Sequence, residues 1–171
     1  MLKKGWWVLP LVTTLLLILD QLTKWLVVSS LALHEAWAPI PSLAAFFEIR
    51  HVTNTGAAFG LFQNGSNLFV IVSFIVSAII IYYYSRLPDG KWPLRFSLAM
   101  QLAGAVGNLI DRLRWGYVVD FLDFHFWPVF NVADTCIVCG VVLLGGILFY
   151  EERCAAQAAH VHETKPCPPA D

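Results

Sequence analysis

The sequence predicts an all-α polytopic membrane protein with four transmembrane helices and a small β-structure on one side of the membrane. Of the 171 residues, 58% are hydrophobic and only 13% are charged, and the mean hydropathy is +0.65. A soluble domain of this size has about a quarter of its residues charged. The apolar residues also gather in four runs, each near the roughly 20 residues with which a helix crosses a bilayer.

The four runs predict helices over residues 6–29, 68–85, 94–110 and 132–150. The third run is the weakest, because it is short and contains Arg95 and Gln101. Aromatic residues near the run ends resemble interfacial belts; they are Trp6, Trp7, Tyr82, Tyr83, Tyr84, Trp92 and Tyr150. We expect the first run to be retained rather than cleaved as a signal peptide, because it is too long for one and contains Asp20 and Lys24.

Basic residues near the run ends set the expected orientation, because cytoplasmic loops carry an excess of Lys and Arg. With the N-terminus inside, the cytoplasmic side holds Lys3, Lys4, Arg86, Lys91, Arg95, Arg153 and Lys165. The outer side then holds Lys24, Arg50, Arg112 and Arg114. Both termini are therefore predicted to be cytoplasmic, with outer segments at residues 31–67 and 111–130.

The first outer segment alternates apolar and polar residues over 47–52, which predicts a strand. Residues 54–56 predict a turn, and the apolar residues 57–62 are expected to touch lipid as part of a strand pair on the bilayer surface. The second outer segment is expected to be a loop that carries Asp120. Residues 1–150 form the predicted membrane domain, and residues 151–171 a disordered cytoplasmic tail.

Polar residues at membrane depth converge on one level in the predicted topology. Helices one and three end near the outer surface, and helix four begins there. This level collects Asp20, Lys24, Asn108, Asp111, Arg112, Asn131 and Asp134, with Asp120 in the adjoining loop. Ionisable residues in a membrane are costly, so each is a candidate functional residue.

Each of these residues also has an ordinary structural interpretation, and both interpretations stay open. Asp20 and Lys24, four residues apart, either form a plain ion pair or support a site. Asp111 and Arg112 fit a helix-end charge pair as well. Asn131 fits a helix N-cap.

Asp134 lies in a first turn, where the helix dipole favours an anion. Asp123 is expected to be structural or solvated. Five glycines are expected to allow close helix packing: Gly104, Gly107, Gly140, Gly145 and Gly146.

Two carboxylates that meet at membrane depth predict a dyad that shares one proton and activates a water. Other chemistries lack their motifs: the sequence has no H-E-x-x-H, no metal-ligand spacing and no G-x-S-x-G. A Ser–Lys dyad with Lys24 has no serine clearly placed opposite the lysine. The net charge of −1 argues against a nucleic-acid partner.

Five segments, in order, resemble those of bacterial lipoprotein signal peptidase, also called signal peptidase II. They are residues 20–24 (DQLTK), 54–60 (NTGAAFG), 107–112 (GNLIDR), 116–121 (GYVVDF) and 130–134 (FNVAD). Each motif alone is weak, but five in order on a four-helix chain are specific. The resemblance covers about residues 6–150.

This resemblance implies an aspartic endopeptidase of the bacterial plasma membrane, sensitive to globomycin, with its site near the extracytoplasmic face. Its substrate is a diacylglyceryl-modified prolipoprotein, cut just before the lipidated cysteine. The catalytic aspartates fall on Asp120 and Asp134, and supporting residues fall on Asp20, Lys24, Asn54, Asn108, Asp111, Arg112 and Asn131. The family's small β-cradle matches the predicted strand. We expect a monomer in contact with membrane lipid, without a metal or cofactor.

A small transporter or proton-relay subunit is the rival hypothesis, with Asp20, Asp111 and Asp134 as relay groups. Relay carboxylates are expected to be distributed through the membrane depth. Here they crowd at one face, which favours the peptidase.

Overall fold

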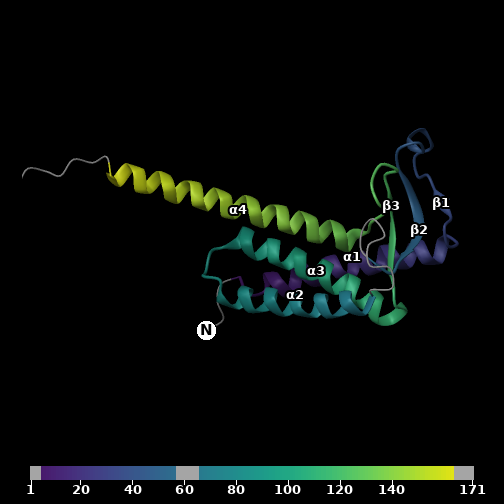
Figure 1. Ribbon diagram of the computed structural model, residues 1–171, viewed down its shortest axis with the longest axis horizontal. Coiled ribbons are helices and arrows are strands. Elements are labelled where there is room, and N and C mark those ends of the chain that lie inside the picture. Colours follow the sequence, from purple (N-terminus) through teal and green to yellow (C-terminus); the bar gives the residue numbers. More distant parts are fainter. Residues whose placement is uncertain (1–4, 57–65, 164–171) are drawn as a thin grey trace, which may run out of the picture.

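The computed structural model describes residues 5–56 and 66–163 and contains four long helices with a small sheet at one end (Figure 1). The helices are α1 (Val8–Ser30), α2 (Ser66–Arg86), α3 (Trp92–Trp115) and α4 (Val132–Glu163). The strands are β1 (Ala36–Trp37), β2 (Glu48–Asn54) and β3 (Val118–Asp123), with a short 3-10 helix at Pro41–Leu43. The apolar segment 57–62, expected to touch lipid, lies outside the described residues.

Three described helices are long and apolar enough to cross a membrane: α1, α2 and the part of α4 from Val132 to Gln157. Four transmembrane helices are therefore not confirmed by this criterion. α3 is the exception because it contains Arg95, Asp111, Arg112 and Arg114, which lower its mean hydropathy.

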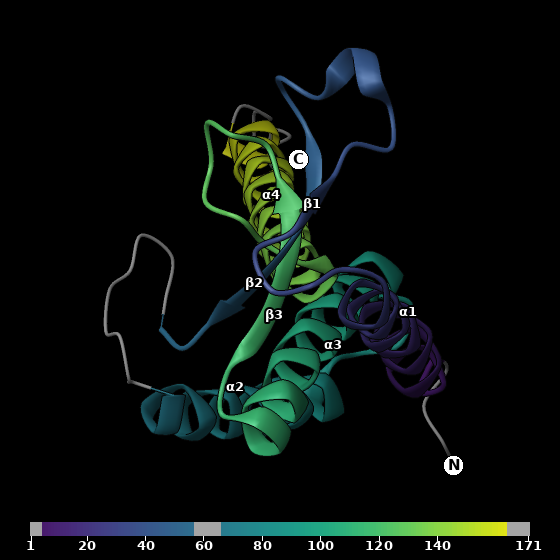
Figure 2. The ribbon, with the colours of Figure 1, turned by 90° about the vertical axis from the view of Figure 1, so that its right-hand side faces the viewer.

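α3 lies at the centre of the bundle and packs against each of the other three helices (Figure 2). Small residues permit this approach. A side chain at Gly104 would collide with the carbonyl oxygen of Ala133 in α4, and a Cβ at Gly140 would lie 2.7 Å from Gln101. Close packing is thus confirmed for these glycines and for Gly107, whereas Gly145 and Gly146 face open space.

The C-terminus of α3 extends beyond the predicted boundary at residue 110. Charged residues indicated a helix end there, but the helix continues to Trp115 because the charges are accommodated by neighbours or by solvent. Gly116 ends it in the left-handed conformation, with φ of 80°, and its N–H donates to the Arg112 carbonyl oxygen at 3.0 Å. Glycine adopts this conformation without steric cost, so the chain turns directly into β3.

The sheet has the antiparallel order β1-β2-β3. β2 confirms the strand predicted over 47–52. The expected loop around Asp120 is wrong, because Asp120 lies within β3 and pairs with Val52 of β2. Val118, Val119 and Phe121 around it are buried, so this short apolar run is a strand in which one acidic residue interrupts the pattern.

Hydrophobic contacts anchor the sheet to the end of α1. Val27 of α1 forms a buried cluster with Val119 and Phe121 of β3, and Ile49 of β2 packs against it. Burial of such side chains stabilises by about 1.5–3 kcal/mol each. The position of Asp120 is therefore fixed by a core shared between helix and sheet.

The end of α4 differs from the expectation of disorder from residue 151. The helix continues to Glu163, and its 32 residues correspond to about 48 Å at 1.5 Å per residue. Residues 151–159 contain two Glu, one Arg and four Ala, which favour helix even without an apolar stripe. Residues 164–171 lie outside the described part.

Candidate active site

Asp120 and Asp134 line one cavity of about 280 Å³ at the sheet end of the bundle. Asp120 comes from the middle of β3 and is 2% exposed, whereas Asp134 comes from the first turn of α4 and is half-buried. Other residues lining this cavity include Asn54, Asn108, Arg112, Phe69, Trp127 and Phe130. The pairing that the sequence predicted is thus brought together across two elements.

Asn131 connects the two aspartates. Its side-chain Nδ2 donates to Oδ1 of Asp120 at 2.7 Å, and its Oδ1 accepts the backbone N–H of Asp134 at 2.9 Å. The backbone N–H of Asn131 donates in return to Oδ2 of Asp134 at 3.3 Å. This reciprocal pair is a capping box at the start of α4. Asn131 is therefore the predicted N-cap and also a direct partner of Asp120.

Two further asparagines complete the hydrogen bonding of the carboxylates. Nδ2 of Asn54 donates to Oδ2 of Asp120 at 2.8 Å, and Nδ2 of Asn108 donates to Oδ1 of Asp134 at 2.7 Å. Every oxygen of the two carboxylates thus accepts a hydrogen bond from an asparagine. The aspartates are held in fixed orientations without a direct ion pair to either carboxylate among the described residues.

The environment raises the pKa of Asp120 to about 7. Burial is the main cause, because it penalises the charged carboxylate, and the nearby negative charge of Asp134 adds to it. Hydrogen bonds from Asn54 and Asn131 and the charge of Lys24 act in the opposite direction. Asp120 can therefore hold a proton near neutral pH.

A buried ion cluster lies behind the aspartates. Nζ of Lys24 is 3.0 Å from Oδ2 of Asp20 and 2.8 Å from Oδ2 of Asp111, and all three side chains are at most 1% exposed. The same Nζ donates to Oδ1 of Asn108 at 3.0 Å. The predicted ion pair of Asp20 and Lys24 is therefore confirmed. Support of a site stays a prediction, and Lys24 contacts Asn108, which donates to Asp134.

The ion cluster also fixes the backbone that carries the aspartates. Oδ1 of Asp20 accepts the N–H of Ala133 at 2.9 Å, next to Asp134, and Oδ2 of Asp111 accepts the N–H of Val119 at 3.3 Å, next to Asp120. Each aspartate of the cavity is thus preceded by a residue anchored to a buried carboxylate.

Gln21 belongs to this cluster, although sequence reasoning assigned it no role. Its Nε2 donates to Oδ2 of Asp20 at 3.1 Å and to Oδ1 of Asp111 at 3.0 Å. The available signal was its position directly after Asp20 within the DQLTK segment. An uncharged amide has an ordinary structural role so often that this signal is weak.

Arg112 is not the partner of Asp111, whose carboxylate pairs with Lys24. Its guanidinium lies 5.0 Å from the centre of the Phe69 ring, and it lines the cavity. Nε of Arg112 is buried without a hydrogen-bond partner within the described residues. A cationic donor is therefore available at the cavity wall.

Asp123 is structural, as expected. Its Oδ2 lies 2.8 Å from Nε of Arg50, and its Oδ1 accepts the N–H of His125 at 2.9 Å. Glu48, Asp123 and His125 bring possible metal-ligand atoms within 4.8 Å of one another. Arg50 also pairs with Glu48 at 3.2 Å and so supplies the cation for this group.

The fold and site define a class: a membrane protein whose helical bundle supports two acidic residues in a cavity at its sheet end. The family model for signal peptidase (SPase) II matches residues 12–150, and the chain therefore belongs to the signal peptidase II family.

Curated relatives agree with this family. The chain is 48% identical over 134 residues to the lipoprotein signal peptidase of Moorella thermoacetica, covering 78% of this chain and 87% of that protein. It is 47% identical over 144 residues to that of Desulforapulum autotrophicum, covering 79% and 87%.

Two solved structures are similar across most of the chain, and both are described as bacterial membrane enzymes. The first has a TM-score of 0.77 at 26% identity and covers 98% of each chain. The second has a TM-score of 0.77 at 29% identity and covers 85% of this chain and 95% of the other.

Proposed function

We propose that this protein is a membrane aspartic endopeptidase that removes the signal peptide from diacylglyceryl-modified prolipoproteins, cutting just before the lipidated cysteine. Membership of the lipoprotein signal peptidase family supports the removal of signal peptides from prolipoproteins. The observation that carries the aspartic mechanism is the pair of Asp120 and Asp134 in one cavity, oriented by three asparagines.

The dyad acts with one shared proton. The ionised carboxylate takes a proton from a water, whose oxygen attacks the scissile carbonyl carbon. The protonated carboxyl polarises the carbonyl oxygen, and the tetrahedral intermediate then collapses as the leaving amine is protonated. The C–N bond breaks, giving a new carboxyl on the signal peptide and an amine on the lipidated cysteine. No metal or cofactor takes part.

Asp120 is the acid and Asp134 the base at the start of the reaction. Asp120 is the more deeply buried of the two, and its raised pKa favours a proton there near neutral pH. Asp134 lies at the N-terminus of α4, where the helix dipole favours a carboxylate. The two environments thus differ, as an acid and a base require.

The supporting residues divide the remaining work. Asn54, Asn108 and Asn131 hold the carboxylates in position. Asp20, Lys24 and Asp111 hold the backbone behind them. Arg112 is free to donate to a substrate carbonyl, because its guanidinium stacks on Phe69 and lines the cavity.

The helical bundle also supports a proposal for the membrane arrangement. α3 has 24 residues, about 36 Å, and packs against all three apolar helices (Figure 2). We therefore propose that it is the fourth crossing of the bacterial inner membrane. The positive-inside pattern puts both termini in the cytoplasm and the dyad near the extracytoplasmic face. There the protein acts as a monomer on a substrate whose acyl chains remain in the bilayer.

Conservative replacement tests this function. Asp120→Asn and Asp134→Asn are each expected to abolish cleavage of a diacylglyceryl-prolipoprotein peptide in detergent, with melting and elution profiles near those of the parent. Globomycin is expected to inhibit the parent protein. Normal cleavage by either variant would refute the dyad. The gathering of Asp20, Asp111, Asp120 and Asp134 at one end of the bundle also favours a peptidase over a proton relay.

A further inference from the structure

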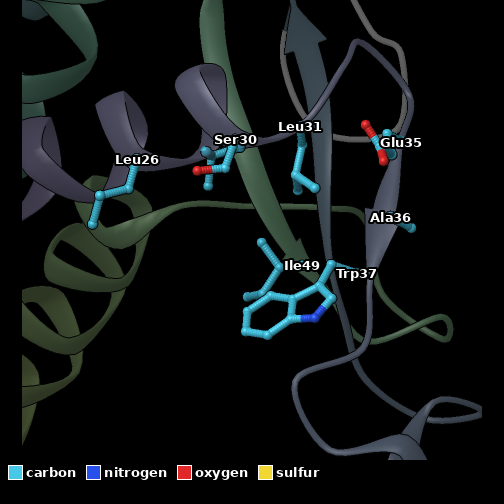
Figure 3. A pocket seen from close by; sticks show the side chains of 8 residues that line it. Leu26, Ser30, Leu31, Glu35, Ala36, Trp37 and Ile49 are labelled. Carbon is cyan, nitrogen blue, oxygen red and sulfur yellow. The ribbon is translucent and has the colours of Figure 1, made fainter.

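A second cavity, distinct from the one at the dyad, lies between the end of α1 and the first two strands (Figure 3). Its volume is about 460 Å³. α1 contributes Leu26, Val27 and Ser30, and the sheet contributes Trp37 and Ile49, which are paired across β1 and β2. We refer to this cavity as the α1–sheet crevice.

Apolar side chains line most of the α1–sheet crevice. Leu26 and Ile49 approach it from opposite sides, and the Trp37 indole lies beside Ile49 (Figure 3). Trp25 and Leu26 on the adjoining surface of α1 are exposed, although α1 is apolar enough to cross a membrane. A crevice that continues such a surface opens to the bilayer, where an acyl chain is the available apolar occupant.

The mouth of the crevice is negatively charged. Glu35 lies at its edge, and its Oε2 accepts the N–H of Ala32 at 2.7 Å, which holds the carboxylate there. Among the residues that the structure describes, no basic side chain forms an ion pair with Glu35. The carboxylate therefore has room for a cationic partner.

The C-terminus of α1 adds to this negative potential. Ser30 and Leu31 line the crevice at the point where the helix ends, and the last turn of α1 contains no basic residue. A helix C-terminus attracts a cation with the equivalent of about half a negative charge. The aromatic face of Trp37 favours a cation in the same way. Glu35, the C-terminus of α1 and the Trp37 ring thus favour a positively charged group at the mouth of a crevice whose interior is apolar.

We propose that the α1–sheet crevice binds a phospholipid with a primary ammonium headgroup. One acyl chain fills the space between Leu26 and Ile49, and the ammonium donates hydrogen bonds to Glu35. A quaternary ammonium has no N–H to donate, and an anionic headgroup is repelled, so the site distinguishes lipids by their headgroups.

Occupancy has a structural consequence for the sheet. The crevice residue Ile49 lies on β2, the strand that ends at Asn54, and Asn54 holds Asp120. A lipid in the crevice therefore supports the strand that positions one carboxylate of the dyad.

Native mass spectrometry of the delipidated full chain in detergent tests the proposal. The protein is titrated with phosphatidylethanolamine, phosphatidylcholine and phosphatidylglycerol that carry identical dioleoyl chains. We expect phosphatidylethanolamine to bind about three- to fivefold more tightly than the other two, the range of an exposed ion pair. Equal affinity for the three lipids would overturn the proposal.

Two variants separate the headgroup from the chain. Glu35→Gln keeps an acceptor for the Ala32 N–H and is expected to abolish the preference for phosphatidylethanolamine over phosphatidylcholine, which depends on the charge-assisted hydrogen bonds to Glu35. Trp37→Ala is expected to weaken all three lipids, because it removes a wall of the crevice, and phosphatidylglycerol least, because its headgroup has no cation to contact the ring. Asp89→Asn, at the exposed turn between α2 and α3, is the matched control and keeps the preference.

A chain-free headgroup completes the test. Glycerophosphoethanolamine is expected not to compete with the lipid, because it lacks the acyl chain. Survival of the preference in Glu35→Gln, or full competition by glycerophosphoethanolamine, would refute a lipid site in the crevice.

Discussion

Asn131 donates a 2.7 Å hydrogen bond from Nδ2 to Oδ1 of Asp120 while it caps the helix that carries the other carboxylate. The Asn131 side chain thus has a structural role and a role in the candidate site, and different atoms serve the two roles. Its oxygen caps α4, and its nitrogen binds Asp120. A substitution that preserves one task and removes the other can separate the two.

Asn131→Asp is expected to retain the cap and lose activity. Aspartate caps helices as well as asparagine does, but its second oxygen cannot donate the hydrogen bond that Oδ1 of Asp120 accepts, and it adds a negative charge beside the dyad. We expect kcat to fall at least about 100-fold, the scale for loss of a preorganised donor, with little change in melting temperature. Asn131→Ala, the control, also loses the cap and about 1 kcal/mol of stability. Wild-type kcat in Asn131→Asp would contradict a site role.

The pH dependence of cleavage reports the proton on Asp120. Because its pKa is raised to about 7, the protonated acid is lost as the pH rises through that value. We expect kcat/KM to fall above about pH 7, and the test is the rate profile between pH 5 and 9 with a lipidated peptide. A rate that stays constant to pH 9 would exclude Asp120 as the acid.

The stability of the protein depends on the same proton with a defined sign. The pKa of Asp120 is higher in the folded state than the ordinary value of 3.8, so the folded chain binds more protons than the unfolded chain between these values. The contribution of Asp120 to the free energy of unfolding is therefore greatest at low pH. It decreases as the pH rises toward 7, by at most about 4 kcal/mol.

Asp120→Asn removes this titration. We expect its melting temperature, relative to the parent, to increase from pH 5 to pH 8 in differential scanning fluorimetry. The change of this melting-temperature difference with pH is the diagnostic quantity. Its size at any one pH also includes a constant contribution, because the introduced amide faces the Nδ2 donors of Asn54 and Asn131 at every pH. Parallel melting curves for the two proteins would contradict the raised pKa.

Lys24→Met is expected to destabilise the bundle by about 3–5 kcal/mol, because it leaves the buried carboxylates of Asp20 and Asp111 without a cation. Melting in detergent measures the loss. Addition of Asp20→Asn and Asp111→Asn is expected to restore much of the melting temperature, since the cluster is then neutral. If Lys24→Met alone were as stable as the parent, the ion cluster would not contribute to the stability of the protein.

Gly107→Ala is expected to destabilise the protein by about 1–3 kcal/mol, as overpacking does. A Cβ there would lie 2.6 Å from Oδ2 of Asp20 and 3.3 Å from the Cβ of Ala133, so the ion cluster must shift. Gly145→Ala is the control, because its Cβ meets open space. Thermal melting and cleavage are measured for both, and equal behaviour would contradict the close packing.

The sequence predicts the helices well because their apolar runs match the thickness of a bilayer. It predicts the two cavity aspartates because acidic residues near such runs stand out. It does not predict that Asp120 lies in a strand, since the pairing with Val52 joins segments that are distant in sequence. Nor does it predict that Arg112 contacts the Phe69 ring rather than Asp111, because Asp111 pairs with Lys24 from another helix.

Lys24 and Asn131 both donate to Oδ1 of Asn108, at 3.0 and 3.2 Å, and so determine the orientation of the Asn108 amide. An ammonium group only donates hydrogen bonds, so Asn108 must turn its oxygen toward Lys24 and its nitrogen toward Asp134. The buried Lys24 cation thus helps to orient the neutral Asn108 amide, and this amide donates its own hydrogen bond to Asp134. An acceptor in place of the lysine would favour the rotated amide, in which Asp134 meets a carbonyl oxygen instead of a donor, and only the hydrogen bond from Asn131 would oppose that rotation.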